Sequence, residues 1–160
     1  MKILVLSLLI AVLGVGAFGQ SKKGIEGVWE LSEITMTGKY AMTMKITQPS
    51  VYIFTKKHYS KAYVASDKPR PVLDDYSKAS REDLYAIFVD GFDANAGTYD
   101  LAGGKLTLRP TVARSPSDMA AGTWITYALA ITGDTATLTP ETSNTGPNKK
   151  PISYKLTRVE

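Results

Sequence analysis

The sequence predicts an all-β fold, an up-and-down antiparallel β-barrel of eight to nine strands with one short helix. Segments that alternate apolar and polar residues recur at close intervals, and short glycine turns join several of them. The last segment places Arg158 on the apolar face of Tyr154 and Leu156. Trp29, in the first segment, is the expected partner, because an indole face and nearby carbonyls can receive an inward arginine. That pairing would bring the first and last strands together and close the sheet.

The expected strands share a period of two residues or a run of β-branched and aromatic residues. In chain order they cover residues 26–36, 42–47, 51–55, 58–65, 97–101, 105–112, 123–131, 135–139 and 152–159. In the first strand, Trp29, Leu31 and Glu33 are expected on one face. The fourth strand alternates as well, but its pattern does not indicate which face is buried. Residues 66–71 hold two prolines and are expected to be a loop, as are residues 114–122 and 140–151.

One helix is expected after the proline-containing loop. Ser80 is a suitable N-cap, and Glu82 and Asp83 follow in the first turn, where carboxylates are favourable. Leu84, Ile87 and Phe88 recur at helical spacing and would pack on the protein. We therefore expect a short helix that plugs one end of the sheet structure.

The chain divides into two parts by composition. Residues 1–19 are expected to be a signal peptide, because Lys2 precedes an uncharged apolar run and Ala17-Phe18-Gly19 offers small residues for cleavage before Gln20. The alternative is an uncleaved membrane anchor, although the run is shorter than the roughly 20 residues a bilayer span needs. Residues 20–160 are expected to form one barrel domain of a secreted or periplasmic protein. The sequence has no cysteine, so it predicts neither a disulfide framework nor lipid attachment through cysteine.

Composition argues against several kinds of chemistry. The net charge of +4 is spread along the chain in lysine pairs at expected turns, which does not indicate nucleic-acid binding. His58 is the single histidine and sits beside Lys56 and Lys57 at an expected hairpin, so neither a zinc site nor a serine triad is predicted. No phosphate-binding glycine loop occurs in the expected domain. No cofactor and no metal are predicted.

Aromatic residues on the strands are the strongest indication of a binding site. Tyrosine combines an apolar body with a hydroxyl that must find a partner when buried, which suits a small-molecule cavity with a few polar anchors. The alternative is that these side chains fill a packed barrel core, because an eight-stranded barrel is only just wide enough for side chains or one small ligand. The candidate lining residues are Tyr52, Phe54, Tyr63, Tyr99, Trp124 and Tyr127.

Four pieces of the sequence, in this order, resemble the bacterial lipocalin-like domain family of the calycin group. They are Gly27-Val28-Trp29, Asp67-Lys68-Pro69-Arg70, the segment from Phe88-Val89-Asp90-Gly91-Phe92 to Ala96-Gly97-Thr98-Tyr99, and Tyr154-Lys155-Leu156-Thr157-Arg158. The resemblance implies a closed barrel whose interior can hold a small apolar molecule, with Trp29 and Arg158 as a structural closure at its base. It does not imply an enzyme.

Three hypotheses follow from these residues. The first is an exported, non-catalytic protein that binds a small apolar or amphipathic molecule in the barrel. The second is an enzyme of isomerase or cyclase type that uses tyrosine and carboxylate groups as acid and base, and the third is a module with a filled barrel that binds a protein partner. Converging polar groups inside the barrel would favour an enzyme, an apolar lining with a mouth would favour a carrier, and a filled barrel would favour the partner module. No oligomeric state is predicted.

Overall fold

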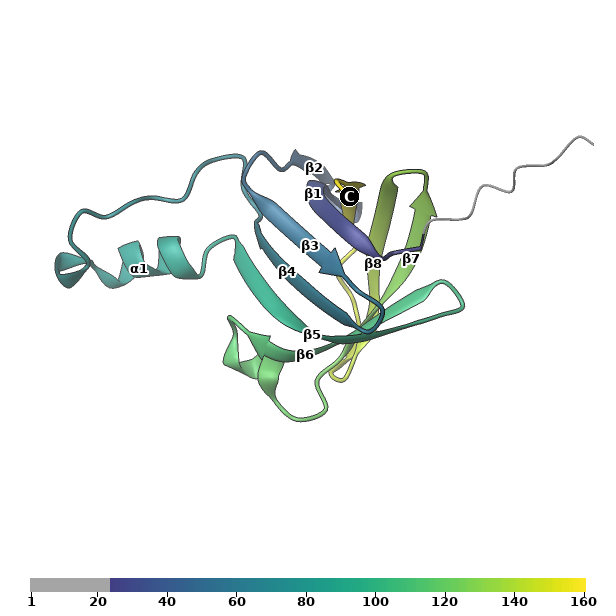
Figure 1. The fold of residues 1–160 in the computed structure, drawn as a ribbon. Coiled ribbons are helices and arrows are strands. Elements are labelled where there is room, and N and C mark those ends of the chain that lie inside the picture. Colours follow the sequence, from purple (N-terminus) through teal and green to yellow (C-terminus); the bar gives the residue numbers. More distant parts are fainter. Residues whose placement is uncertain (1–23) are drawn as a thin grey trace, which may run out of the picture.

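The computed structural model describes residues 24–160, in which eight antiparallel strands close into a barrel (Figure 1). The order around the barrel is β10, β1, β3, β4, β5, β6, β7 and β8, and β8 pairs again with β10. Strands that pair around the barrel follow one another in the sequence, apart from the first and last strands, which close the circle, and two short strands that lie outside it. The predicted up-and-down barrel is therefore confirmed. The predicted signal peptide falls outside the described residues.

The strands and the helix have the following bounds: β1 Gly27–Met36, β2 Met42–Lys45, β3 Ser50–Phe54, β4 His58–Val64, α1 Arg81–Phe88, β5 Phe92–Ala102, β6 Lys105–Ala113, β7 Ile125–Thr132, β8 Thr135–Ser143, β9 Gly146–Pro147 and β10 Ile152–Arg158. The two extra strands are β2, which pairs with β1, and β9, which pairs with β8. Short 3-10 turns at Gly38–Tyr40, Tyr76–Lys78 and Pro116–Met119 interrupt the longer connections. Among residues 24–160, no helix is long and apolar enough to span a bilayer.

The first and last strands pair as the sequence predicts, with Trp29 opposite Arg158. The predicted faces of β1 are correct only as far as Leu31. A β-bulge at Ser32 shifts the register, so that Glu33 does not continue the inward face and Ile34 is buried instead. The hydroxyl of Ser32 donates to the carbonyl of Lys155 across the bulge. A strict period of two cannot predict this change, because a bulge adds one residue to one strand only.

Pro110 lies inside β6, where the sequence predicts a strand, and Pro140 lies inside β8, where the sequence predicts a loop. Pro110 in β6 and Pro140 in β8 both stand next to a bulge, opposite Gly97 and Tyr127. A bulge already interrupts the ladder, so the missing proline N–H costs little there. The prediction that residues 140–151 are a loop is therefore wrong for residues 140–143, which continue β8, and for residues 146–147, which form β9.

The start of β5 was also missed. This strand begins at Phe92, five residues before the predicted start. The prediction started too late because Asp93 and Asn95 point into the barrel while their apolar neighbours do not. An inverted pattern of polar residues inside and apolar residues outside does not read as a half-buried strand. The structure shows which face of β4, the fourth predicted strand, is buried: Tyr59, Lys61 and Tyr63 lie on its inner face.

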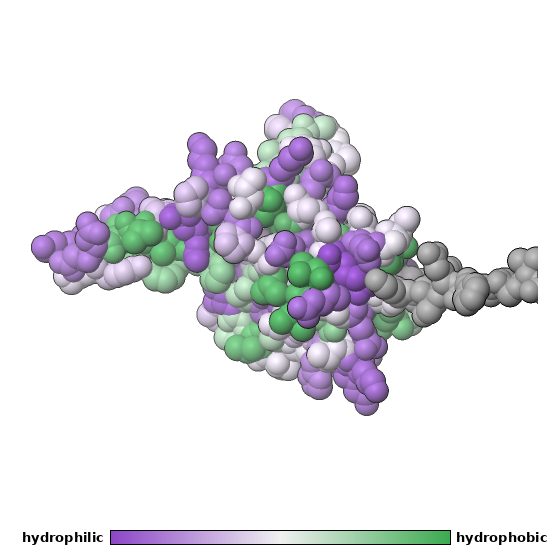
Figure 2. Space-filling view, turned by 45° about the horizontal axis from the view of Figure 1, so that its top comes forward, coloured by the Kyte–Doolittle hydropathy of each residue, from purple (hydrophilic) through white to green (hydrophobic). Residues whose placement is uncertain are grey.

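The helix forms where predicted, but it does not plug the barrel. Ser80 caps α1 in a capping box with Asp83, whose backbone N–H donates to the Ser80 hydroxyl at 3.1 Å. The helix lies on an arm that projects from the barrel at the left of Figure 1. Of its residues only Ile87 is buried, and Phe88 is half exposed. Figure 2 shows apolar side chains on the surface of this arm. The helical spacing of apolar residues predicts the helix correctly, but it does not specify what the apolar face packs against.

Candidate functional site

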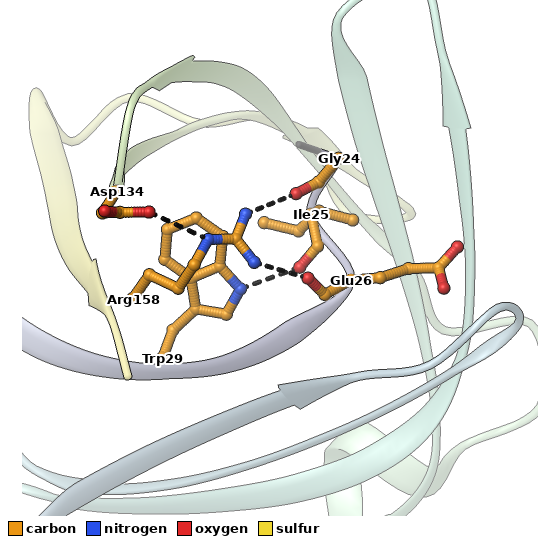
Figure 3. Close-up of polar contacts among 6 residues, drawn as sticks. All are labelled: Gly24, Ile25, Glu26, Trp29, Asp134 and Arg158. Atoms are coloured by element: carbon orange, nitrogen blue, oxygen red, sulfur yellow. Dashed lines mark hydrogen bonds and ion pairs between the residues drawn. The ribbon is translucent and has the colours of Figure 1, made fainter. Parts of the chain in front are cut away.

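One end of the barrel is closed around Arg158 (Figure 3). Its guanidinium carbon lies 4.0 Å from the centre of the Trp29 ring, and its terminal nitrogens donate to the carbonyls of Glu26 and Gly24, each at 2.7 Å. Its Nε lies 3.5 Å from Asp134 Oδ1, within ion-pair distance but without a hydrogen bond. The indole N–H of Trp29 donates to the carbonyl of Ile25 at 2.8 Å. The two terminal nitrogens of the guanidinium therefore tie the last strand to the chain that precedes the first.

Three of the predicted lining residues lie in the packed core and not on the cavity described below. Tyr52, Phe54 and Tyr99 are buried. The ring of Phe54 meets that of Tyr99 edge to face at 5.5 Å, and the Tyr99 hydroxyl donates to the carbonyl of Thr55 at 2.5 Å. This half of the barrel is filled by side chains, as the narrow bore of an eight-stranded barrel allows.

The other half of the barrel holds a cavity of about 370 Å³, a volume suited to a small organic molecule. It brings together the remaining predicted residues, Tyr63, Trp124 and Tyr127. The residues that complete the wall and rim come from six strands and two loops: Tyr59, Lys61, Asp93, Asn95, Leu108, Pro110, Ser117, Asp118, Thr123, Ile125, Ser143, Asn144, Thr145 and Tyr154. The lining is mixed, because aromatic rings and Leu108 alternate with charged and amide groups.

An ion pair is built into the cavity wall. Lys61 Nζ lies 2.8 Å from Asp93 Oδ2, and the two side chains are 9% and 24% exposed. Lys61 stands opposite Asn95 in the ladder and reaches Asp93 diagonally on the neighbouring strand. Its ammonium also lies 5.3 Å from the ring centre of Tyr63 and 6.0 Å from that of Tyr52. The carboxylate and the ring faces together compensate a charge that burial alone would make very costly.

A second polar pair repeats this diagonal arrangement one step along the strands. Tyr59 stands opposite Gly97, and its hydroxyl donates to Asn95 Oδ1 at 2.7 Å. Sequence reasoning did not single out Lys61, Asp93 or Asn95. The available signal was the presence of Lys61 between Tyr59 and Tyr63 on one face, since a lysine flanked by two inward tyrosines must itself point inward.

The tyrosines of the cavity keep their protons. Burial raises the pKa of Tyr59, Tyr63 and Tyr127 far above the ordinary value of 10.0, Asp93 raises it further, and neighbouring tyrosines add to the shift of Tyr59 and Tyr63. Burial likewise raises the pKa of Tyr154. At neutral pH these phenols are therefore neutral hydrogen-bond donors and acceptors with electron-rich ring faces.

The rim of the cavity is formed by two loops that hold each other. The backbone N–H of Asn144 donates to the carbonyl of Trp124 at 3.3 Å, and the backbone N–H of Trp124 donates to Asn144 Oδ1 at 3.4 Å. Asp118, in the 3-10 turn Pro116–Met119, lies on the same rim. This carboxylate raises the pKa of Tyr59 and Tyr127 in addition to burial.

Other hollows lie outside the barrel interior. A groove of about 560 Å³ runs between the outer face of β3 and β4 and the arm that carries α1, where Arg70 lies 4.6 Å from the ring centre of Phe92 and donates to the carbonyl of Ile87 at 3.0 Å. A second hollow of about 580 Å³ lies beside the closed end, next to the exposed His58. Within residues 24–160, no group of three or more His, Cys, Asp or Glu side chains is arranged to hold a metal ion. The interior cavity is thus the site where polar and aromatic groups converge.

Comparison with known proteins extends only to the fold. No family model matches the chain, and no curated protein matches its sequence. It is similar to the crystal structure of a lipocalin-like protein from Bacteroides uniformis, at 14% identity and a TM-score of 0.46 over 83% of this chain and 96% of that chain. It is also similar to an uncharacterized protein from Bacteroides eggerthii, at 12% identity and a TM-score of 0.45 over 83% and 98% of the two chains. The lipocalin-like family stays a resemblance, and the barrel itself rests on its strand pairing.

Proposed function

We propose that this protein is a non-catalytic carrier or sensor that binds one small amphipathic molecule inside the barrel. The observation that carries the proposal is the cavity of about 370 Å³, closed below by packed side chains and lined by aromatic rings and two polar pairs. A cavity of this size encloses most of a small ligand's surface, and a few fixed polar groups orient it.

The lining favours an amphipathic ligand over a purely apolar one. Asn95 and the phenol of Tyr59 already bond to each other, and Lys61 already pairs with Asp93. An apolar molecule placed against these groups would remove their access to water without supplying a partner, which costs free energy. A ligand with a polar end can bond to their remaining donors and acceptors while its apolar part packs on Tyr63 and Tyr127.

The enzyme hypothesis remains the second candidate, because Lys61, Asp93 and the Tyr63 phenol converge in one wall. The raised pKa of the buried tyrosines restricts them to donating protons, so a general base would have to be Asp93. That carboxylate already accepts a hydrogen bond from the Lys61 ammonium at 2.8 Å, so one of its oxygens is occupied. The partner-module hypothesis assumed a filled barrel, and the cavity speaks against that premise.

Trp124 provides the test. It lies on the cavity rim, while the other tryptophan, Trp29, is fully buried at the closed end. The purified protein should bind a fluorescent amphipathic probe with a stoichiometry near one, and the probe should quench Trp124. Trp124→Phe should keep the binding but lose the quenching, because only the distant indole remains. Binding without saturation, or quenching that persists in Trp124→Phe, would refute the interior site.

Native mass spectrometry of the protein purified from its own source separates the two candidate functions. A carrier should retain one unmodified molecule, and denaturation should release it intact. Recovery of a substrate and product pair, related by isomerisation or ring closure, would favour the enzyme instead.

We further propose that the protein works outside the cytoplasm, as the apolar segment before Gln20 indicates. N-terminal sequencing of the extracytoplasmic fraction should find a chain that begins at Gln20. A full-length chain that stays in the membrane fraction would contradict export by cleavage.

A further inference from the structure

We propose that the ligand's polar end is an organic cation, and that Asp118 on the rim is its counter-ion. This inference rests on the proposed binding function and names the chemical class of the ligand.

The charges that face the cavity are unbalanced. Lys61, Asp93 and Asp118 are the ionisable lysine and carboxylate groups on its lining. Lys61 and Asp93 neutralise each other at 2.8 Å. Asp118 makes no ion pair with any side chain of residues 24–160. The cavity therefore carries one uncompensated negative charge at its mouth, and a ligand carboxylate or phosphate would face that charge at close range.

The aromatic groups that share the cavity with Asp118 suit the same ligand. Trp124, Tyr127 and Tyr59 lie on the same lining as this carboxylate. Ring faces attract an ammonium group through their quadrupole, most strongly when the group is partly removed from water. The protein uses this interaction already, since the Lys61 ammonium lies over Tyr63 and Tyr52. A carboxylate with aromatic walls can hold a primary to quaternary amine without further donors.

The geometry also assigns an orientation. Leu108, which is 2% exposed and the most buried side chain of the lining, marks the cavity floor, whereas Asp118 lies in a rim loop. An amphipathic amine would place its apolar part on this floor, and its cationic end would remain at the rim near Asp118. The Lys61 and Asp93 pair would stay intact on the wall.

A matched series of probes tests the inference: octyltrimethylammonium, octanol and octanoate, each titrated into the purified protein by calorimetry. The cation should bind about fivefold more tightly than the alcohol, as expected for one counter-ion and cation-π contacts, and octanoate should bind most weakly. Asp118→Asn should bring the ratio of cation to alcohol affinity close to one. Asp67→Asn removes the same charge from an exposed position outside the cavity and should keep the wild-type ratio.

The possible failures are distinguishable. Octanol binding with no preference for the cation, or a preference that survives in Asp118→Asn, would overturn the inference and leave the proposed binding function standing. Tightest binding by octanoate would assign the ligand the opposite charge. If none of the three probes bound, the carrier function would fail together with the inference.

Discussion

Arg158 and Lys61 are two buried cations whose charges are compensated in different ways. Backbone carbonyls and an indole face surround Arg158, with Asp134 at 3.5 Å. Lys61 depends on one carboxylate, Asp93, and on tyrosine rings. The planar fork of arginine suits several fixed acceptors, whereas the compact ammonium of lysine suits a single close partner. The two sites therefore respond differently to substitution.

Arg158→Ala should lower the free energy of unfolding by roughly 2 to 4 kcal/mol, because it leaves two carbonyls unpaired and uncovers the Trp29 ring. Arg158→Lys should recover only part of this loss, since lysine lacks the planar stack and the two separate donor nitrogens of the guanidinium. Chemical denaturation measures both changes. Arg109→Ala is the control, because Arg109 pairs with Asp100 on the exposed outer face. A loss at position 158 no larger than that of the control would contradict the structural role of the closure.

Lys61→Met should destabilise the fold by about 2 to 4 kcal/mol, since it leaves the partly buried Asp93 carboxylate without its partner. The double variant Lys61→Met with Asp93→Leu should fall within about 1 kcal/mol of the wild type, because replacing both members of a buried ion pair by apolar groups is often nearly neutral. A double-mutant cycle monitored by denaturation gives the coupling. Additive losses in the double variant would show that the pair contributes nothing through its mutual attraction.

Among the elements, β5 has the most demanding backbone. It presents Asp93 and Asn95 to the cavity at one end and packs Tyr99 into the core at the other, and a bulge separates the two halves. Gly97 stands at this bulge. A Cβ there would lie 2.0 Å from the carbonyl oxygen of Arg109, a contact that no rotamer change can relieve because both partners are backbone.

Gly97→Ala should therefore destabilise the barrel by more than about 2 kcal/mol, as strain at a special backbone position does. Gly24→Ala is the matched control, since a Cβ at Gly24 meets nothing within 4 Å. Thermal unfolding monitored by circular dichroism compares the two variants. Equal melting temperatures would mean that β5 can shift away from β6 without loss of packing.

For the whole molecule, the buried tyrosines make stability depend on alkaline pH. Burial raises the pKa of Tyr59, Tyr63 and Tyr127 in the folded protein, whereas the unfolded chain ionises near 10. The folded state thus keeps protons that the unfolded state releases. These tyrosines therefore leave the free energy of unfolding unchanged below about pH 10 and lower it as the pH rises above that value.

We therefore expect the barrel to unfold cooperatively at alkaline pH, with tyrosinate absorbance from the buried phenols appearing together with the loss of structure. Tyr127→Phe should move the transition to higher pH after correction for its effect at neutral pH, because one linked ionisation is removed. Ionisation of all the cavity tyrosines while the circular dichroism stays native would show that water reaches them in the folded state.

Several features of the fold were readable because they depend on local chemistry. The run of β-branched and aromatic residues in β3, the alternation in β4 and β10, the N-cap at Ser80 and the inward phase of Arg158 follow from residue preferences and side-chain direction within a few residues. The bulges at Ser32, Thr111 and Glu141 were not readable, since each depends on how two strands fit across the ladder. Beyond a bulge, the predicted assignment of residues to the inner and outer face of the strand is therefore wrong.

The sequence by itself determined that this chain forms a closed sheet whose first and last strands meet at Trp29 and Arg158, because an inward arginine on an apolar strand face needs an aromatic face and carbonyls to compensate its charge. Only the tertiary structure decided which tyrosines fill the core and which line a cavity. Tyr52, Phe54 and Tyr99 share the inward direction of Tyr63 and Tyr127, but their depth along the barrel differs. Depth, like the diagonal pairing of Lys61 with Asp93, arises from strand register between distant segments, which no local pattern encodes.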